Sequence, residues 1–214
     1  MADEPDFVSG ASGPANPYAG LGQGGPYLGG ASASATAGGD ADSGTVFPST
    51  PNNGDEYVYA ADTTNGVFWR FKWYAAGNYW AFIGGPPLFS LVATTEGTTS
   101  VTYAALATAG PSIVLPFAAD YDVSVGASIY GPVSAGIGFF SIMSYDIGGT
   151  GAADADAIYN ANAVNSATAV GCNVSKLKRK AGLTAVTLTA KYKSTAGTTA
   201  TFEQRWMAVW PVKK

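Results

Sequence analysis

The stretch TTNGVFWRFKWYAAGNYWAF, residues 63–82, contains eight aromatic side chains and two cations within twenty residues. The Asn-Gly pair that begins at Asn65 is the pair that tight hairpin turns prefer, and a Gly-Asn turn follows later in the stretch. Between these turns, alternation along an extended chain places Trp69, Phe71 and Trp73 on one face. The stretch therefore predicts part of a small antiparallel meander.

The predicted meander has three strands, at residues 56–60, 67–74 and 79–83, and a Gly-Gly-Pro-Pro segment ends it. Three short strands are marginally stable alone, so one face is expected to pack against a neighbour. The other face carries Phe68, Arg70 and Tyr74. Two interpretations of the aromatic run stay open: packing within a sheet, or a platform on which rings and Arg70 bind a ligand such as a sugar.

Histidine is absent, and Cys172 is the one cysteine of the chain. The absence of histidine excludes Ser-His-Asp and Cys-His catalysis and His-ligated metal sites. A single cysteine excludes an internal disulfide and a cysteine-based zinc site. Because Cys172 falls within a predicted strand, we interpret it as a small buried apolar residue. No cofactor is expected.

A membrane partner is not expected either. No stretch has the roughly 18 consecutive apolar residues of a membrane span. Residues 1–30 lack a basic start followed by an apolar run, so no export signal is expected.

Charge is distributed unevenly along this chain of net charge −4. Eight acidic residues and no cation precede Arg70, whereas nine cations and one acid, Glu203, follow Asp156. Such asymmetry can mark a nucleic-acid surface, but the acidic composition and the lack of an aromatic-basic groove pattern argue against that partner. We interpret it as acidic and basic ends of neighbouring subunits that meet in an assembly.

Residues 1–45 are dominated by Gly, Ala, Ser and Pro, with no helical or strand period. Alone, such a segment cannot bury enough apolar area to offset the entropy lost on ordering. It is either a flexible linker or an extended arm that orders on a partner surface. For the arm, five spaced apolar residues are the candidate anchors: Phe7, Tyr18, Leu21, Tyr27 and Leu28.

From Leu91 onward, turn signals recur at spacings typical of a β-sandwich or barrel. In LTAVTLTAKYK, residues 183–193, Val186, Leu188, Ala190 and Tyr192 are predicted to face inward. The last strand is apolar on both faces, which indicates burial on two sides. About eight strands favour a jelly-roll-like sandwich of two sheets. They are expected near residues 99–103, 112–117, 121–128, 138–145, 157–159, 168–174, 183–193 and 202–212.

Two charged segments are candidates for chemistry. In SYDIGGTGAADADA, Asp146, Asp154 and Asp156 could bind calcium, and the last two could pair for glycoside hydrolysis. A solvated turn is the third interpretation, and it is the one that an Asp-Ala-Asp pattern in a glycine-rich loop favours. The cluster KLKRK, residues 176–180, is interpreted as a surface turn, a subunit-interface patch or an electrostatic attachment point for an anionic surface.

The segment NNGDEYVYAADTTNGVFWRFKWYAAGNYWAFIGGPPL, residues 52–88, resembles a module of structural proteins of tailed bacteriophages, particularly those of actinobacterial hosts. It keeps the NGV-W-R core and the GGPPL end of that module. TYAALATAGPSIVLPFAADYDVSVGA, residues 102–127, and TLTAKYKSTAGTTATFEQRWMAVWPV, residues 187–212, are similar to the β-sandwich domain that follows the module. The resemblance covers about residues 51–214.

The resemblance implies a non-enzymatic virion protein, made in the cytoplasm of a bacterial host. Residues 1–45 would anchor it to other virion proteins of the tail or the capsid, residues 46–90 would form the meander, and residues 91–214 the sandwich. The all-β chain would project as a tail-associated fibre or minor tail protein, assembled as a homotrimer and able to adhere to a host glycan. The alternatives are a capsid decoration protein or head fibre with the same fold, and a polysaccharide-cleaving virion enzyme.

Overall fold

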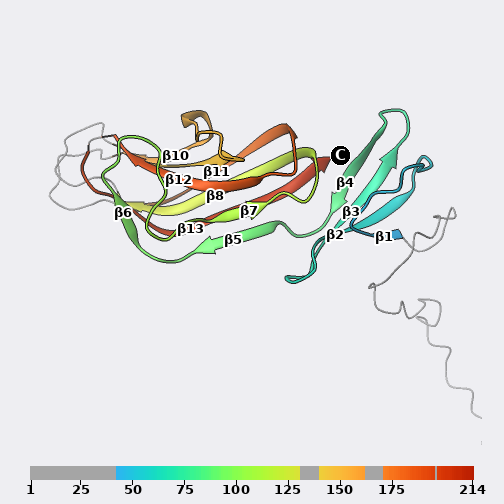
Figure 1. Ribbon diagram of the computed structural model, residues 1–214, viewed down its shortest axis with the longest axis horizontal. Helices are drawn as coiled ribbons and strands as arrows, with labels where there is room; N and C mark the ends of the chain where they lie inside the picture. The colour runs from blue at the N-terminus through green and yellow to red at the C-terminus, as the bar shows by residue number, and fades with distance from the viewer. Residues whose placement is uncertain (1–41, 131–139, 162–170, 196) are drawn as a thin grey trace, which may run out of the picture. The chain divides into compact units, whose positions relative to one another are not determined.

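Strands account for nearly all the regular secondary structure in the part of the chain that the structure describes (Figure 1). The computed structural model describes residues 42–130, 140–161, 171–195 and 197–214. The described strands are β1 (Asp42–Gly44), β2 (Glu56–Asp62), β3 (Val67–Tyr74), β4 (Tyr79–Gly84), β5 (Leu88–Val92), β6 (Glu96–Thr98), β7 (Ser112–Val114), β8 (Ala119–Tyr130), β9 (Phe140–Ile147), β10 (Ile158–Ala161), β11 (Gly171–Leu183), β12 (Thr187–Ser194) and β13 (Ala200–Lys213). A 3-10 turn, η1, spans Asp154–Asp156. The prediction of an all-β fold is confirmed.

The strands form two sheets in a sandwich-like arrangement. Sheet A has nine strands in the order β1-β2-β3-β4-β13-β8-β11, with β5 and β6 also paired to β13. Sheet B has four strands in the order β10-β9-β12-β7. Paired strands are antiparallel except β1 and β2, which are parallel. The part of the chain that the structure describes contains no helix that could span a membrane.

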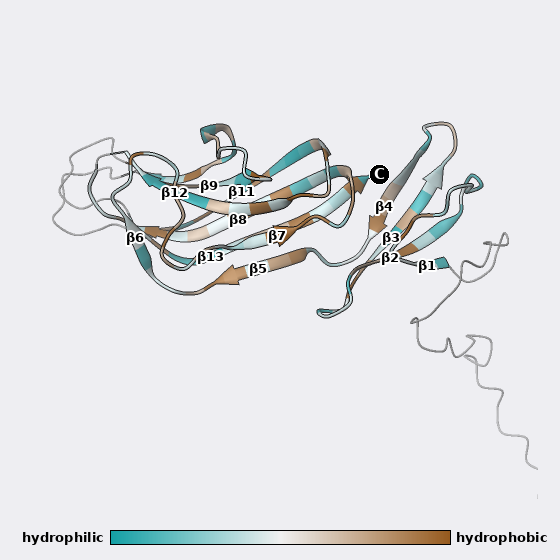
Figure 2. Cartoon of the chain, viewed as in Figure 1, coloured by the Kyte–Doolittle hydropathy of each residue, from teal (hydrophilic) through white to brown (hydrophobic). Residues whose placement is uncertain are grey.

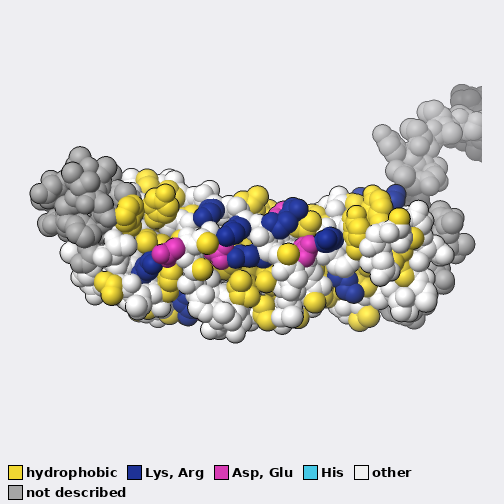
Figure 3. All heavy atoms as spheres, turned by 90° about the horizontal axis from the view of Figure 1, so that it is seen from above, with side chains coloured by type: hydrophobic (Ala, Val, Ile, Leu, Met, Phe, Trp, Pro, Cys, Tyr) yellow, Lys and Arg dark blue, Asp and Glu magenta, His cyan; other side chains and the backbone are white. Residues whose placement is uncertain are grey.

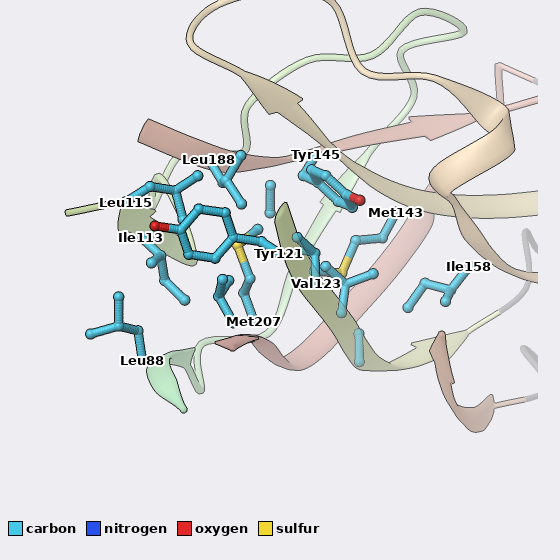
Figure 4. Packing of buried hydrophobic residues seen from close by; sticks show 14 of the residues in the cluster. Leu88, Ile113, Leu115, Tyr121, Val123, Met143, Tyr145, Ile158, Leu188 and Met207 are labelled. Carbon is cyan, nitrogen blue, oxygen red and sulfur yellow. The ribbon is translucent and has the colours of Figure 1, made fainter. Parts of the chain in front are cut away.

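The core between the sheets follows from alternation along their strands (Figure 4). On β12, Leu188, Ala190 and Tyr192 are fully buried, as the sequence predicts. On β8 of the opposite sheet, alternate residues such as Tyr121 and Val123 are also fully buried. Burial of a large apolar side chain contributes about 1.5–3 kcal/mol, so this double layer supplies most of the driving force for folding.

The meander comprises β2, β3 and β4, close to the three predicted strands. On β3, Trp69 and Phe71 are fully buried and Trp73 is half-buried, while Arg70 and Tyr74 are exposed, so the predicted alternation is confirmed. Figure 2 shows hydrophobic and hydrophilic residues interspersed along these strands. The buried face explains why aromatic residues are so dense in this stretch.

The turn between β2 and β3 differs from a two-residue hairpin. The side chain of Asp62 accepts hydrogen bonds from the backbone N–H of Asn65 at 3.1 Å and from its side-chain amide at 2.7 Å. Gly66 has a φ of 68°, whereas Asn65 is not in the left-handed region. The Asn-Gly pair therefore marks the turn correctly, but one residue rather than two has a positive φ.

The two ends of the NGV…GGPPL motif meet in space. The indole N–H of Trp69 donates a hydrogen bond of 2.7 Å to the carbonyl of Pro86. Gly85 lies beside them with a φ of 136°, and a Cβ at this position would lie 2.4 Å from the carbonyl oxygen of Phe68. Only glycine allows both the conformation and the close approach. The motif thus closes the meander onto itself.

The meander is joined to the rest of the protein by aromatic ring contacts and by backbone hydrogen bonds. Phe117, which follows β7, has its ring centroid 4.7 Å from that of Tyr59 and 5.9 Å from that of Phe71. The backbone of Trp80 in β4 exchanges hydrogen bonds of 2.8 and 2.9 Å with Lys214. Meander and sandwich therefore share one sheet and one aromatic core.

A β-bulge in β13 changes which residues of that strand face the core. Gln204 has a φ of 47°, and the register with β8 shifts between Glu203 and Trp206. Before the bulge Phe202 is fully buried, and after it Arg205 and Met207 are fully buried. The extra residue reverses the alternation, as bulges do, and turns Arg205 inward.

Several strand predictions are corrected by the structure. β5 and β6 were missed, because residues 84–87 were interpreted as the end of a sheet and the next strand was predicted at residues 99–103. KLKRK, predicted as a turn after a strand, lies within the long strand β11. Cys172, predicted to be buried, is exposed on the same strand.

Candidate functional site

The outer face of sheet A carries a row of exposed apolar side chains, here called the aromatic strip. Phe89 and Leu91 of β5 are 59% and 50% exposed, and Leu177 of β11 is 61% exposed. Trp206 and Trp210 of β13 lie between these strands and are half-buried. A row of large apolar groups left partly open to solvent on a rigid sheet is typical of a recognition surface.

The position of Trp206 depends on the residue opposite it. Gly126 of β8 pairs with Trp206, and a Cβ on this glycine would lie 2.3 Å from Cε2 of the indole. The indole therefore lies directly over the glycine backbone. On its other side the ring stacks with Phe89, with centroids 6.3 Å apart and planes 30° apart. The glycine thus makes room for the ring on the sheet surface.

An open groove of about 500 Å³ lies next to Trp210. Its apolar lining comes from Phe82, Leu177, Trp210, Pro211 and Val212. Its polar lining comes from Asp122, Ser124 and Arg179. A few polar groups in a mainly apolar depression are the composition expected of a small-ligand site.

Arg179 and Asp122 form a two-point ion pair in this groove. Nε and an Nη of Arg179 each donate to a different carboxylate oxygen of Asp122, both at 2.9 Å. Arg179 and Asp122 lie directly opposite each other in the register of β11 and β8, so the two strands fix the geometry of this bidentate ion pair. The hydrogen bonds to the Asp122 carboxylate raise the pKa of Arg179.

Comparison with known proteins gives little beyond this geometry. No protein-family model matches the chain, and no curated protein matches it. Among solved structures, the infectious bursal disease virus VP2 subviral particle is similar, with 14% sequence identity and a TM-score of 0.29. The similarity covers 61% of this chain and 34% of that chain, so the chain spans about a third of its length. A similarity this low assigns neither a family nor a function.

The predicted ligand residues Phe68, Arg70 and Tyr74 share the outer face of β3 but do not converge. An Nη of Arg70 binds the carboxylate of Glu56 at 2.9 Å. The ring of Tyr74 stacks on that of Tyr79, with centroids 5.8 Å apart. Phe68 lies six residues from Tyr74 on the same strand, about 20 Å away. Each stays a candidate, but the three do not line one pocket.

Each of the predicted calcium residues forms an ion pair with lysine. Asp146 pairs with Lys191 at 3.3 Å. Asp154 pairs with Lys193 at 2.7 Å and accepts a hydrogen bond of 2.6 Å from the phenol of Tyr103. Within the described ranges, no group of three or more acidic, cysteine or histidine residues is placed to hold a metal ion. The three aspartates are thus ion-pair partners in this fold.

Asp156 belongs to a cluster in which the even-numbered lysines of β11 hold the loop around η1. Lys176 donates to the carbonyls of Ala155 and Ala157 at 2.9 and 3.2 Å. Lys178 pairs with Asp156 at 2.8 Å, and Lys180 pairs with the other carboxylate oxygen. Figure 3 shows cationic and acidic side chains intermixed on one face of the molecule. These lysines are therefore internally paired, which explains how a cationic run fits within a strand.

Replacement of Asp156 by asparagine tests this loop clamp. Burial alone would raise the pKa of Asp156, but Lys178 and Lys180 hold it below the ordinary value. The resulting stabilisation, about 1–3 kcal/mol, is present above the unfolded-state pKa of about 3.9 and is lost as pH falls through the lower folded-state pKa. Urea unfolding is measured from pH 7 to pH 2. The free energies of unfolding of the unmodified protein and of Asp156→Asn should become equal only at the acid end of this range. A constant difference across that range would contradict the clamp.

The candidate anchors Phe7, Tyr18, Leu21, Tyr27 and Leu28 lie outside the described residues. Of the predicted arm, residues 42–44 form β1, which pairs with β2. The anchoring role stays a prediction.

The aromatic strip was missed by sequence reasoning. Apolar residues on both faces of the last strand indicated burial on two sides, whereas the structure leaves Trp206 and Trp210 half-buried. A signal was present in β8, where Asp122, Ser124 and Ser128 alternate with buried apolar residues. A strand with one polar face has one face in solvent, so its neighbour in the sheet does too.

Proposed function

We propose that the protein is a non-enzymatic structural protein of a tailed-phage virion, built on the module that residues 52–88 resemble. The observation that carries the proposal is the contact between Trp69, Gly85 and Pro86, which are the residues of the shared motif. These contacts give the motif residues a part in shaping the meander. A motif that shapes a rigid projecting sheet suits a protein whose role is structural.

The packing of the chain supports the same proposal. The meander and the sandwich share an aromatic core through Phe117 and a continuous sheet through β4 and β13. In the absence of disulfides, such continuous pairing gives durability outside the cell by packing alone. Assembly as a homotrimer, with adhesion to a host surface, completes the proposed role.

The state of the candidate catalytic carboxylates favours a non-enzymatic role over glycoside hydrolysis. Lys193 and the Tyr103 phenol lower the pKa of Asp154. The pKa of Asp156 is lowered as well, by two lysines that outweigh its burial. A general acid of a glycosidase needs a raised pKa so that it is protonated at neutral pH. Neither aspartate meets this requirement.

Quantification of the protein in purified phage particles tests the proposal and its placement. We expect a handful of copies per particle, measured by mass spectrometry against the major capsid protein, because a tail-associated fibre or minor tail protein occupies few sites. Tens to hundreds of copies would replace tail placement by capsid decoration or a head fibre. Absence from washed, infectious particles would overturn the virion role itself.

A further inference from the structure

We propose that the groove beside Trp210 binds a neutral saccharide chain, which runs along β13 toward Trp206. The interpretation of this binding as adhesion to a host rests on the proposed virion role. The binding itself can be tested on the purified chain.

The aromatic groups provide the stacking surfaces. Trp206 and Trp210 point to the same face of β13, four residues and therefore about 13 Å apart. Between them, Ala208 is buried and pairs with Ser124, so no bulky side chain separates the two indoles along the strand. Indole rings offer broad apolar faces that suit the C–H faces of sugars. Two indoles at this spacing suit an extended ligand rather than a single ring.

The polar groups indicate a neutral ligand rich in hydroxyl groups. Arg179 and Asp122 neutralise each other, so the groove has no net charge with which to select an anion or a cation. Each still has hydrogen-bonding capacity: the guanidinium retains N–H donors, and the carboxylate retains acceptor lone pairs. The side chains are 60% and 25% exposed, so both can reach a ligand. Donor and acceptor side by side match the vicinal hydroxyls of a saccharide.

The same polar groups make a second copy of the chain a poorer occupant. Charged residues are depleted at the centre of protein interfaces, where desolvation is most complete. Here an ion pair lies in the groove itself, flanked by Ser124 and by the apolar Leu177 and Trp210. A saccharide keeps such groups hydrogen-bonded, whereas an apolar protein surface would leave them unsatisfied.

Titration calorimetry on the purified full chain tests the proposal. The probes are soluble oligosaccharides of glucose, galactose, mannose and N-acetylglucosamine, each up to 10 mM, with an anionic uronic-acid oligosaccharide for comparison. We expect at least one neutral chain to bind and the anionic one to bind more weakly. Trp210→Ala and Arg179→Gln should each weaken binding about tenfold or more.

Tyr159→Ala is the matched control, since it removes an exposed ring from β10 of sheet B and should leave affinity unchanged. Tyr74→Ala tests the predicted ligand face on β3 instead. Circular dichroism melting confirms that each variant is folded, and Arg179→Gln tests the groove even if Trp210→Ala unfolds. No binding by any neutral probe, preference for the anionic probe, or loss of binding only in Tyr74→Ala would overturn the proposal. If the unmodified chain binds no sugar and Trp210→Ala loses self-association in native mass spectrometry, the groove binds a second copy of the chain instead, and the proposal is overturned. A negative result in calorimetry does not affect the copy-number measurement on phage particles. The saccharide proposal and the virion proposal can therefore be disproved independently.

Discussion

Trp69→Ala is expected to lower the free energy of unfolding by about 3–5 kcal/mol, because it removes a fully buried indole from the aromatic core. It also leaves the Pro86 carbonyl without the N–H that donates to it. Urea denaturation followed by circular dichroism measures the loss. Since a domain of ordinary stability has about 5–15 kcal/mol in total, this change approaches the limit of folding.

Two further variants separate the contribution of the Trp69 ring to stability from that of its hydrogen bond to Pro86. Trp69→Phe keeps an aromatic ring and removes the donor, so about 1–3 kcal/mol should be lost. Tyr74→Ala on the exposed face of the same strand should cost well under 1 kcal/mol. Equal losses for Trp69→Ala and Tyr74→Ala would contradict the assignment of inner and outer faces of β3.

Arg205→Ala is the second large effect, with an expected loss of about 3–5 kcal/mol. The side chain of Arg205 is fully buried, with an Nη 3.3 Å from the Glu96 carboxylate and its guanidinium over the ring of Tyr192. It also donates to the carbonyls of Thr94 and Thr108 at 3.3 and 3.4 Å. Removing it leaves these acceptors without a cation and opens a cavity.

A double-mutant cycle distinguishes lost charge pairing from lost volume. Arg205→Met fills most of the space, and Glu96→Gln removes the unpaired charge that remains, so the double variant should recover stability relative to Arg205→Met alone. Thermal unfolding of the four proteins gives the coupling energy. Additive effects would show that Arg205 acts through packing and the loop carbonyls rather than through Glu96.

The sequence predicts the parts of the fold whose signals are local. Alternation in residues 67–74 and 187–193 identifies β3 and β12 and their inner faces, because period 2 reports one-sided burial directly. The β11 lysines could not be placed in this way, since their partners are carbonyls and Asp156 of a loop distant in sequence. The inward turn of Arg205 depends on a bulge at Gln204, which no residue pattern marks.

The candidate sites show the same division. The face of Arg70 and Tyr74 follows from alternation within one strand and was predicted. The aromatic strip combines Phe89, Leu177 and Trp210 from three strands that meet only after the sheet order is known. Three strands can be ordered in several ways, so their composite surface was beyond sequence reasoning.

The backbone bonds between Trp80 and Lys214 also bear on how the chain folds. They join residues more than 130 positions apart, and contacts of such long range slow folding because a large loop must close first. Until β13 arrives, β4 presents a bare edge to which another chain can add. During synthesis, β4 therefore lacks its neighbouring strand until β13 has been made. The exposed edge of β4 is therefore where the risk of aggregation is greatest while the chain is being made.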